Sequence, residues 1–233
     1  MAGRTVLLAG ATLVLGMGGP PAGLSGGARL APFAVAAVHM EQNATEGDVE
    51  VVFEVDGGEE GLAKLSVTAP DGRAVIDFTS AGGTGMGIRQ FRLESPEPSN
   101  PELVRTAYPA GVYTFAGATS TGRKLQGKAT LTHKLPGAPT LLLPRGSAGV
   151  VGSQGMEITW TAAEGMAAQI LTLEQEESGE SITARLPGPT RTFVVPSGFL
   201  RAGTAYKIGL GVVAPGGNAT FVEATFTARA RKD

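Results

Sequence analysis

Residues 200–212 read LRAGTAYKIGLGV, and the alternation within this stretch decides the fold. Every second residue from Tyr206 to Val212 is large and apolar, whereas the residues between them are Lys or Gly. A period of two predicts a β-strand with one face in a hydrophobic core. A glycine-rich turn at 215–218 and a second strand from Thr220 to Phe226 complete the predicted hairpin.

A looser copy of this hairpin lies in the first half of the chain. Residues 108–115 read YPAGVYTF, a turn follows at Thr121 and Gly122, and a strand is predicted around 129–132. Because each hairpin needs further strands to bury its apolar face, the repetition predicts two small β domains in tandem.

The composition agrees with a turn-rich β protein. The chain has 233 residues, of which 35 are Gly and 15 are Pro, and only 17% are charged. Each half, at about 95 residues, is long enough to bury a core without disulfides or metals. The absence of cysteine excludes disulfides, thiol lipidation and thiolate zinc sites.

The N-terminal stretch resembles a secretory signal peptide. Arg4 precedes an apolar run over 5–17, and a segment rich in Gly, Pro and Ala continues to Ala37. The run is too short for a comfortable membrane span, and no later apolar segment approaches that length. We therefore expect an exported protein, periplasmic or extracellular, that is cleaved between Ala22 and Ala37 and has no membrane span in its mature chain.

Alternating segments predict the other strands, and prolines mark the breaks between them. Residues 95–101 contain three prolines, which remove hydrogen-bond donors and exclude a central strand, and one helical turn is predicted at 102–107. Met156, Ile158 and Trp160 share one face of a strand, so Trp160 is expected in a core. The remaining strands are predicted around 49–55, 64–68, 75–78, 88–94, 141–143, 169–174, 182–186 and 192–195.

The second half resembles a fibronectin type III domain. Trp160 and the run Leu200-Arg201-Ala202-Gly203-Thr204-Ala205-Tyr206 match the family's core Trp and the entry to its sixth strand, although Ala202 replaces the usual Pro. The resemblance implies that the Tyr206 hydroxyl bonds to the backbone a few residues upstream. The first half is similar to a β-sandwich domain found ahead of fibronectin type III units in exported bacterial proteins, which implies no activity.

The predicted fold class is all-β, with two tandem immunoglobulin- or fibronectin type III-like sandwiches after the signal peptide. The predicted boundaries are 1–37 for the signal peptide and spacer, 38–135 for the first β-sandwich, 136–139 for a stiff Pro-rich linker, 140–229 for the fibronectin type III-like domain and 230–233 for a basic tail.

Charge excludes one class of partner. From Val38 to the linker, 13 acidic and 9 basic side chains make a net charge of −4, and the second half has 8 of each. Neither half shows the basic stripe that nucleic-acid binding needs.

We find no catalytic, cofactor or metal site in the sequence. His39 and His133 are expected as exposed strand-end residues, because neither has a companion at metal-ligand spacing. Oxygen ligands suited to Ca²⁺ gather at Glu41, Asn43, Glu46 and Asp48, with Asp56, Glu59 and Glu60 as further candidates. The alternative is a solvated acidic edge in which Asn43, Thr45, Gly47 and Asp48 shape a turn through hydrogen bonds from side chain to backbone.

The sequence therefore predicts a non-catalytic exported protein whose sandwiches contact a protein or a cell-envelope component. The alternative is an accessory module that binds Ca²⁺ or a glycan for an envelope or enzyme complex. The oligomeric state stays open.

Overall fold

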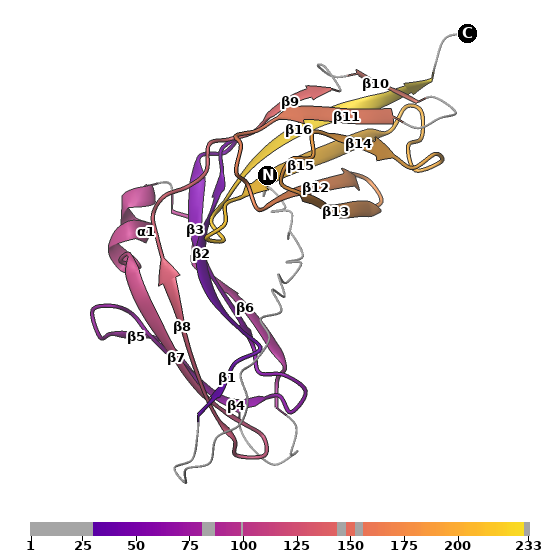
Figure 1. Ribbon diagram of the computed structural model, residues 1–233. Helices are drawn as coiled ribbons and strands as arrows, with labels where there is room; N and C mark the ends of the chain where they lie inside the picture. Colours follow the sequence, from indigo (N-terminus) through magenta and orange to yellow (C-terminus); the bar gives the residue numbers. More distant parts are fainter. Residues whose placement is uncertain (1–29, 81–86, 99, 144–147, 152–155, 231–233) are drawn as a thin grey trace. The chain divides into compact units, whose positions relative to one another are not determined.

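The computed structural model describes residues 30–80, 87–98, 100–143, 148–151 and 156–230, and β-strands are the main secondary structure of these residues, with one short helix (Figure 1). The signal peptide and the basic tail lie outside the described residues. The chain divides into two compact units. The first comprises the described parts of Met1–His39 and Glu50–His133, and the second those of Met40–Val49 and Lys134–Asp233.

The first unit is a sandwich of two sheets. One sheet has the strand order β1-β8-β7-β4-β5, and in the other β3 lies between β2 and β6. The bounds are β1 Ala31–Pro32, β2 Val35–Asn43, β3 Asp48–Asp56, β4 Leu62–Thr68, β5 Ala74–Thr79, β6 Gln90–Glu94, β7 Gly111–Thr119 and β8 Lys124–Leu131. Their inward alternate residues form the core, as in Val51, Phe53 and Val55 of β3.

The first unit begins earlier than the predicted boundary at residue 38. β1 pairs in parallel with β8, and Phe33 is buried with its ring centroid 6.4 Å from that of Phe115. Gly117 makes room for this ring, since a β-carbon there would lie 2.9 Å from Phe33. The prediction that residues 31–37 belong to a spacer outside the domain is therefore wrong. Most residues of this segment are small, and the one aromatic among them, Phe33, fills the core.

The structure contains the helical turn predicted at 102–107 and the strand predicted at 88–94. α1 spans Pro101–Ala107, and the Asn100 side chain accepts a hydrogen bond from the Glu102 N–H, which caps the helix. In β6, Phe91 packs edge to face on Phe78, with the two ring centroids 4.9 Å apart. This agrees with the predicted position of Phe91 on the inner face of the strand. Leu93 is 36% exposed, so its predicted inward position is only partly correct.

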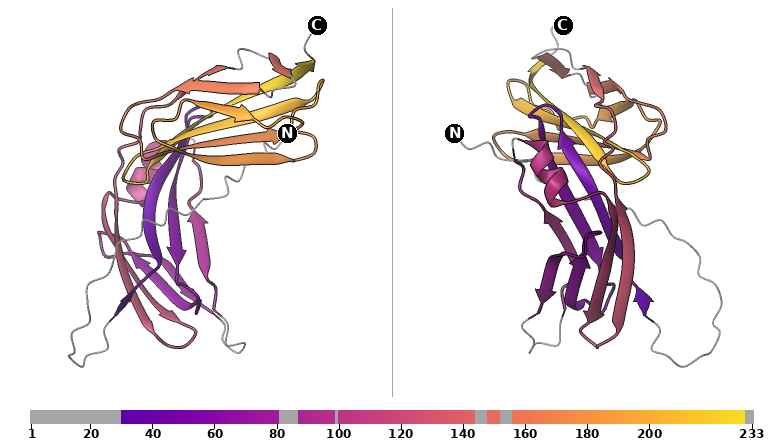
Figure 2. Two further views of the ribbon diagram at one scale, coloured as in Figure 1. Left: turned by 45° about the vertical axis from the view of Figure 1, so that its right-hand side comes forward. Right: turned by 90° about the vertical axis from the view of Figure 1, so that its left-hand side faces the viewer.

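The second unit is also a sandwich, drawn from orange to yellow in Figure 2. One sheet contains β13-β12-β15-β16 and the other β14-β11-β9, and β10 pairs in parallel with β16. The bounds are β9 Thr140–Leu143, β10 Ala148–Val151, β11 Met156–Thr161, β12 Ala168–Gln175, β13 Ser181–Pro187, β14 Thr192–Val195, β15 Ala205–Val213 and β16 Ala219–Ala230. β10 was missed, since the sequence predicted a loop there.

The core of the second unit confirms the alternation read from the sequence. Trp160 is 1% exposed, and Tyr206, Ile208 and Leu210 are fully buried in the same cluster. Figures 1 and 2 show the strands of the two sheets of this unit. The predicted all-β sandwich fold is confirmed. No helix among the described residues is long and apolar enough to cross a membrane.

The second unit is not one continuous segment, which differs from the predicted boundaries. The tip of the β2–β3 hairpin, Met40–Val49, belongs to it, and Glu41–Asn43 pairs in parallel with Ala219–Phe221 of β16. The Thr220 hydroxyl donates to the carbonyl of Pro136 at 2.8 Å. Pro136, the first residue of the predicted linker, is thus hydrogen-bonded to a residue of the second unit. The proline content of the linker could not predict this contact, because its partner is distant in the sequence.

Candidate functional site

The acidic tip of the β2–β3 hairpin is a hydrogen-bonded turn. The Asn43 Oδ1 accepts from the N–H of Thr45 at 3.0 Å and of Glu46 at 3.4 Å, and Gly47 adopts φ +84°. No group of three or more His, Asp or Glu side chains among the described residues could hold a metal ion. The turn alternative for Glu41, Asn43, Glu46 and Asp48 therefore describes this segment better than the Ca²⁺ alternative.

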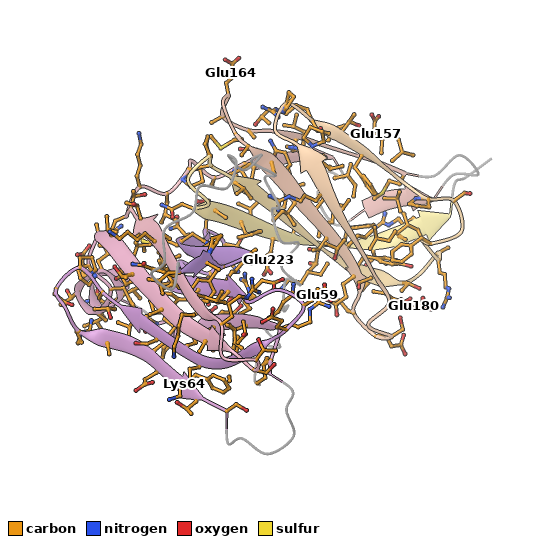
Figure 3. All side chains as sticks on the ribbon, turned by 60° about the horizontal axis from the view of Figure 1, so that its bottom comes forward. Glu59, Lys64, Glu157, Glu164, Glu180 and Glu223 are labelled. Carbon is orange, nitrogen blue, oxygen red and sulfur yellow. The ribbon has the colours of Figure 1, made fainter. Side chains whose placement is uncertain are left out.

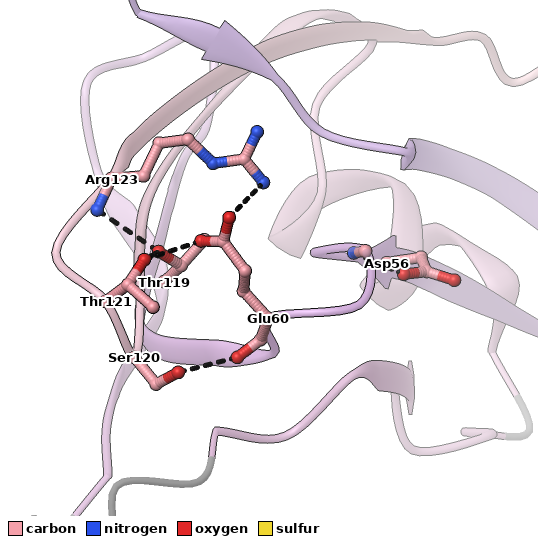
Figure 4. Close-up of polar contacts among 7 residues, drawn as sticks. Asp56, Glu60, Thr119, Ser120, Thr121 and Arg123 are labelled. Carbon is pink, nitrogen blue, oxygen red and sulfur yellow. Dashed lines mark hydrogen bonds and ion pairs between the residues drawn. The ribbon is translucent and has the colours of Figure 1, made fainter.

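The other candidate acids take part in local contacts of the first unit. Asp56 accepts from the Gly58 N–H at 2.7 Å, and Glu59 forms an ion pair with Arg89 at 3.0 Å. Glu60 accepts from the Thr121 hydroxyl at 2.6 Å and pairs with Arg123 at 3.3 Å (Figure 4). The Thr121 hydrogen bond, followed by that of Thr119 and the Arg123 charge, lowers the pKa of the Glu60 carboxyl.

The two histidines occupy structural positions. His39 is 8% exposed within β2, so its predicted exposed strand end is wrong, because the strand continues to Asn43. His133 is half-buried, and its Nε2 lies 2.8 Å from the carbonyl oxygen of Tyr108. The structure does not bring either imidazole into a group of metal ligands within its described part.

Each unit contains a tyrosine whose hydroxyl is hydrogen-bonded to the backbone a few residues upstream. The Tyr206 hydroxyl donates to the Phe199 carbonyl at 3.1 Å and accepts from the Arg201 N–H at 2.9 Å, as the fibronectin type III resemblance implied. The Tyr113 hydroxyl donates to the Pro109 carbonyl at 3.0 Å. Burial raises the pKa of Tyr113 to about 12. These aromatics brace the loops from inside the cores, so they offer no platform for a sugar ring.

Two glycosylation-type triplets occur at Asn43 and Asn218. Asn218 is 3% exposed, its Oδ1 accepts from the Met40 N–H, and its Nδ2 donates to the Lys134 carbonyl, both at 2.9 Å. This buried side chain leaves no room for a glycan in the folded protein. The glycine-rich segment 83–87 that imitates a phosphate loop lies almost wholly outside the described residues.

Two shallow hollows occur on the described surface. One of about 160 Å³ in the first unit is lined by Val35, Glu54, Val55, Asp56, Gln90, Phe91 and Arg92. The other, of about 430 Å³ in the second unit, is lined by Glu164, Gly165, Met166, Gly188, Pro189 and Arg191. The Arg191 guanidinium donates to the carbonyls of Gly188 and Thr190, both at 2.7 Å, so it closes the loop beside this hollow. Figure 3 shows Glu164 directed away from its loop.

The most distinctive surface is the outer face of β4, β7 and β8, which we call the lysine face. It carries Lys64 on β4 and Lys124 and Lys128 on β8, all exposed (Figure 3 labels Lys64). Register places Lys64 opposite Ala118 and Ala118 opposite Lys124. Given the strand spacing, the backbones of Lys64 and Lys124 lie about 10 Å apart.

Small side chains separate the three lysines. The residues between them on the same face are Ser66, Thr68, Thr114, Ala116, Ala118 and Gln126, of which only Gln126 has a long side chain. None of the three lysines forms an ion pair within the described part of the chain. A flat face with unpaired cations suits contact with an anionic surface.

Sequence reasoning missed the lysine face. The net charge of −4 for the first half conceals it, because the acids lie on other elements. Lys124 and Lys128 stand four residues apart in a strand, which places them on one face. Lys64 joins them only through the β4-β7-β8 strand order.

Comparisons with known proteins show similarity of fold. No protein-family model matches the chain, and no curated protein does. Solved structures with similar folds include a tetra-tandem repeat in the extending region of a large adhesion protein (13% identity, TM-score 0.32, covering 84% of this chain and 50% of that one). The FN1-FN3 domains of chicken CNTN1 match at 12% identity with a TM-score of 0.36, covering 86% of this chain and 69% of theirs.

A two-domain fibronectin type III segment of chicken tenascin matches at 12% identity with a TM-score of 0.31, covering 83% of this chain and 97% of that one. The chain thus spans half the length of the adhesion-protein repeat structure. Similarity at this level concerns the β-sandwich fold alone.

Proposed function

We propose that this chain is a non-catalytic, exported interaction protein whose β-sandwiches contact a protein or cell-envelope component. The observation that carries the proposal is the lysine face. Lys64, Lys124 and Lys128 are held on a paired sheet, exposed and without an ion-pair partner among the described residues. A rigid sheet presents such charges in fixed positions, which favours selective binding.

The candidate chemical groups support a scaffold role. Asn43 shapes a turn, Glu60 fastens the β7–β8 turn, and the two tyrosines brace loops. Each of these contacts serves the fold locally. The Ca²⁺ or glycan alternative has no specific observation in its favour.

Site-specific photo-cross-linking in cells tests this function. A photoreactive amino acid at Gln126, which is exposed on the lysine face, should give a discrete cross-linked product. The same group at Thr161, exposed on β11 of the second unit, serves as the matched control. Lys124→Glu with Lys128→Glu should abolish the Gln126 product. Equal products from both positions, or none from Gln126, would contradict the proposal.

A further inference from the structure

The triplet Asn-Ala-Thr occurs twice in the chain, at 43–45 and at 218–220, and the two copies have opposite surroundings. Asn218 is 3% exposed, and both polar atoms of its amide are hydrogen-bonded to the backbone. Asn43 is partly exposed at the end of β2, and the residues that follow it, 44–47, form an exposed turn. Identical triplets therefore present one buried and one accessible acceptor for N-linked glycosylation.

The turn does not need the amide nitrogen of Asn43. The Oδ1 atom accepts from the N–H groups of Thr45 at 3.0 Å and of Glu46 at 3.4 Å. Because the carboxamide group is planar, an oxygen that faces these backbone amides leaves the nitrogen on the side away from them. Among the described residues, the Asn43 Nδ2 atom has no hydrogen-bond partner. A sugar attached to Nδ2 would leave both hydrogen bonds of the turn intact.

We infer that Asn43 is the attachment site of an N-linked glycan and that Asn218 stays unmodified. The inference depends on the export that the proposed function includes, but not on the lysine face. The second substrate is an oligosaccharide linked to a lipid through pyrophosphate, which a membrane-bound transferase supplies.

The transfer forms one bond and breaks another. The Nδ2 atom of Asn43 attacks the anomeric carbon of the first sugar, so a C–N bond forms while the C–O bond to the pyrophosphate breaks. One amide proton passes to a base of the transferase. The lipid pyrophosphate leaves with the bonding electron pair, so no oxidant or reductant is required.

The Thr45 hydroxyl is free of its folded-state partner while the chain is being made. N-linked acceptors need a hydroxyl two residues after the asparagine. In the folded chain, the Thr45 hydroxyl accepts from the Glu223 N–H at 2.8 Å. Glu223 follows Thr45 by 178 residues, so the first triplet is synthesised long before this partner exists. The first triplet is therefore open to a transferase during export.

The second triplet has no such interval. The Asn218 side chain bonds to the Met40 N–H and the Lys134 carbonyl, and both of these groups are made before it. The Thr220 hydroxyl donates to the carbonyl of Pro136, which is also made earlier. Folding can therefore bury this triplet as soon as it emerges, and the buried amide then excludes a glycan.

Mass spectrometry of the full chain, isolated from the periplasm or the medium of its own cells, tests the inference. Proteolytic fragments should carry a glycan on Asn43, located by fragmentation of the peptide, and no glycan on Asn218. The third asparagine of the chain, Asn100, is a control for the pattern, because Pro101 follows it and excludes it as an acceptor.

Three variants separate the acceptor from the turn. Asn43→Asp keeps an oxygen for the turn but removes the acceptor nitrogen, so the glycan should be lost while the fold is retained. Thr45→Ala should cause the same loss, whereas Thr45→Ser keeps a hydroxyl and should retain the glycan. Circular dichroism of the variants should match that of the native chain. A glycan that survives Asn43→Asp or Thr45→Ala would contradict the assigned acceptor.

An exported native chain without a glycan on Asn43 would overturn the inference and leave the proposed function standing, because the Gln126 cross-link does not involve this turn. A glycan on Asn218, or on the Thr45 hydroxyl itself, would also overturn it. A chain found only in the cytoplasm would contradict both the inference and the export in the proposed function.

Discussion

The hairpin β7–β8 of the first unit and the hairpin β15–β16 of the second begin alike and close differently. Both contain a fully buried tyrosine whose hydroxyl donates to an upstream carbonyl, Tyr113 to Pro109 and Tyr206 to Phe199. The Tyr206 hydroxyl also accepts from the Arg201 N–H. The second corner is therefore held by two hydrogen bonds, and the first by one.

Their turns show a larger difference. The β7–β8 turn is fastened by exposed, charged contacts in which Glu60 accepts from Thr121 and pairs with Arg123 (Figure 4). The β15–β16 turn is fastened by the buried Asn218 amide, which bonds to Met40 and Lys134. The stabilisation that exposed charged contacts contribute depends on pH and salt, whereas the contribution of a buried neutral amide does not. The same hairpin motif is thus stabilised by exposed charged groups in the first unit and by a buried amide in the second.

Replacing the tryptophan beneath the second hairpin should have the largest effect. Trp160→Ala removes a side chain that is 1% exposed and should lower the free energy of unfolding by about 3–5 kcal/mol. Urea unfolding followed by circular dichroism measures this loss. Val194→Ala, at a residue 58% exposed on the adjacent β14, should change stability by less than about 0.5 kcal/mol. Equal effects from both variants would contradict the assigned core.

Asn218→Ala tests the buried amide of the β15–β16 turn. It leaves the Met40 N–H and the Lys134 carbonyl without their partner, which should lower the free energy of unfolding by about 2–3 kcal/mol. The loss should be independent of salt between about 0.1 and 1 M. A loss that added salt removes would show that the contact is electrostatic and that our contrast between the turns is wrong.

The two tyrosine corners are compared directly by removing each hydroxyl. Tyr206→Phe loses two hydrogen bonds and should destabilise by about 2 kcal/mol, while Tyr113→Phe loses one and should destabilise by about 1 kcal/mol. Chemical denaturation of both variants at neutral pH checks the ratio. Equal losses would mean that the Arg201 bond contributes nothing, and the reverse order would contradict the contrast between the two corners.

Alkaline pH should affect the first corner through Tyr113. Its pKa is raised from 10 to about 12, so its contribution to stability is present below pH 10 and is lost as pH rises towards 12. The free energy of unfolding should fall over this interval by at most about 1.4 kcal/mol per pH unit from this group. Tyr113→Phe should remove that part of the slope, which stability curves at several pH values would reveal.

The smallest effect is expected in acid, at Glu60. Because its pKa is lowered from 4.5 in the folded protein, its stabilising contribution is present above pH 4.5 and is lost as pH falls through the lowered value. Glu60→Gln should flatten this part of the stability curve, with little change at pH 7. A curve that Glu60→Gln leaves unaltered in acid would show that the exposed contacts of the β7–β8 turn contribute no stability.

Much of the fold could be predicted from local patterns, and the exceptions have physical causes. The period-two segments located most strands, and Asn100 with Pro101 explains why a helix begins where one turn was expected. Phe33 was missed because small residues surround it. The β10 strand was missed because its segment shows no alternation and gains its partner, β16, only in the folded chain.

The candidate site follows the same division. Asn43 could be assigned to a turn, since its partners lie two and three residues away. Asn218 contacts Met40, which is 178 residues away in the sequence. The lysine face combines residues of β4 and β8, and the order of these strands in the sheet cannot be predicted from their own sequences. No local pattern could show either.

The sequence by itself determined most strand positions, most inward residues and the Tyr206 corner, because these depend on side-chain alternation and on neighbours a few residues apart. Only the tertiary structure decided which segments complete each sandwich and which charges share a face. The reason is that strand pairing places residues side by side through backbone hydrogen bonds, which are nearly the same for every sequence.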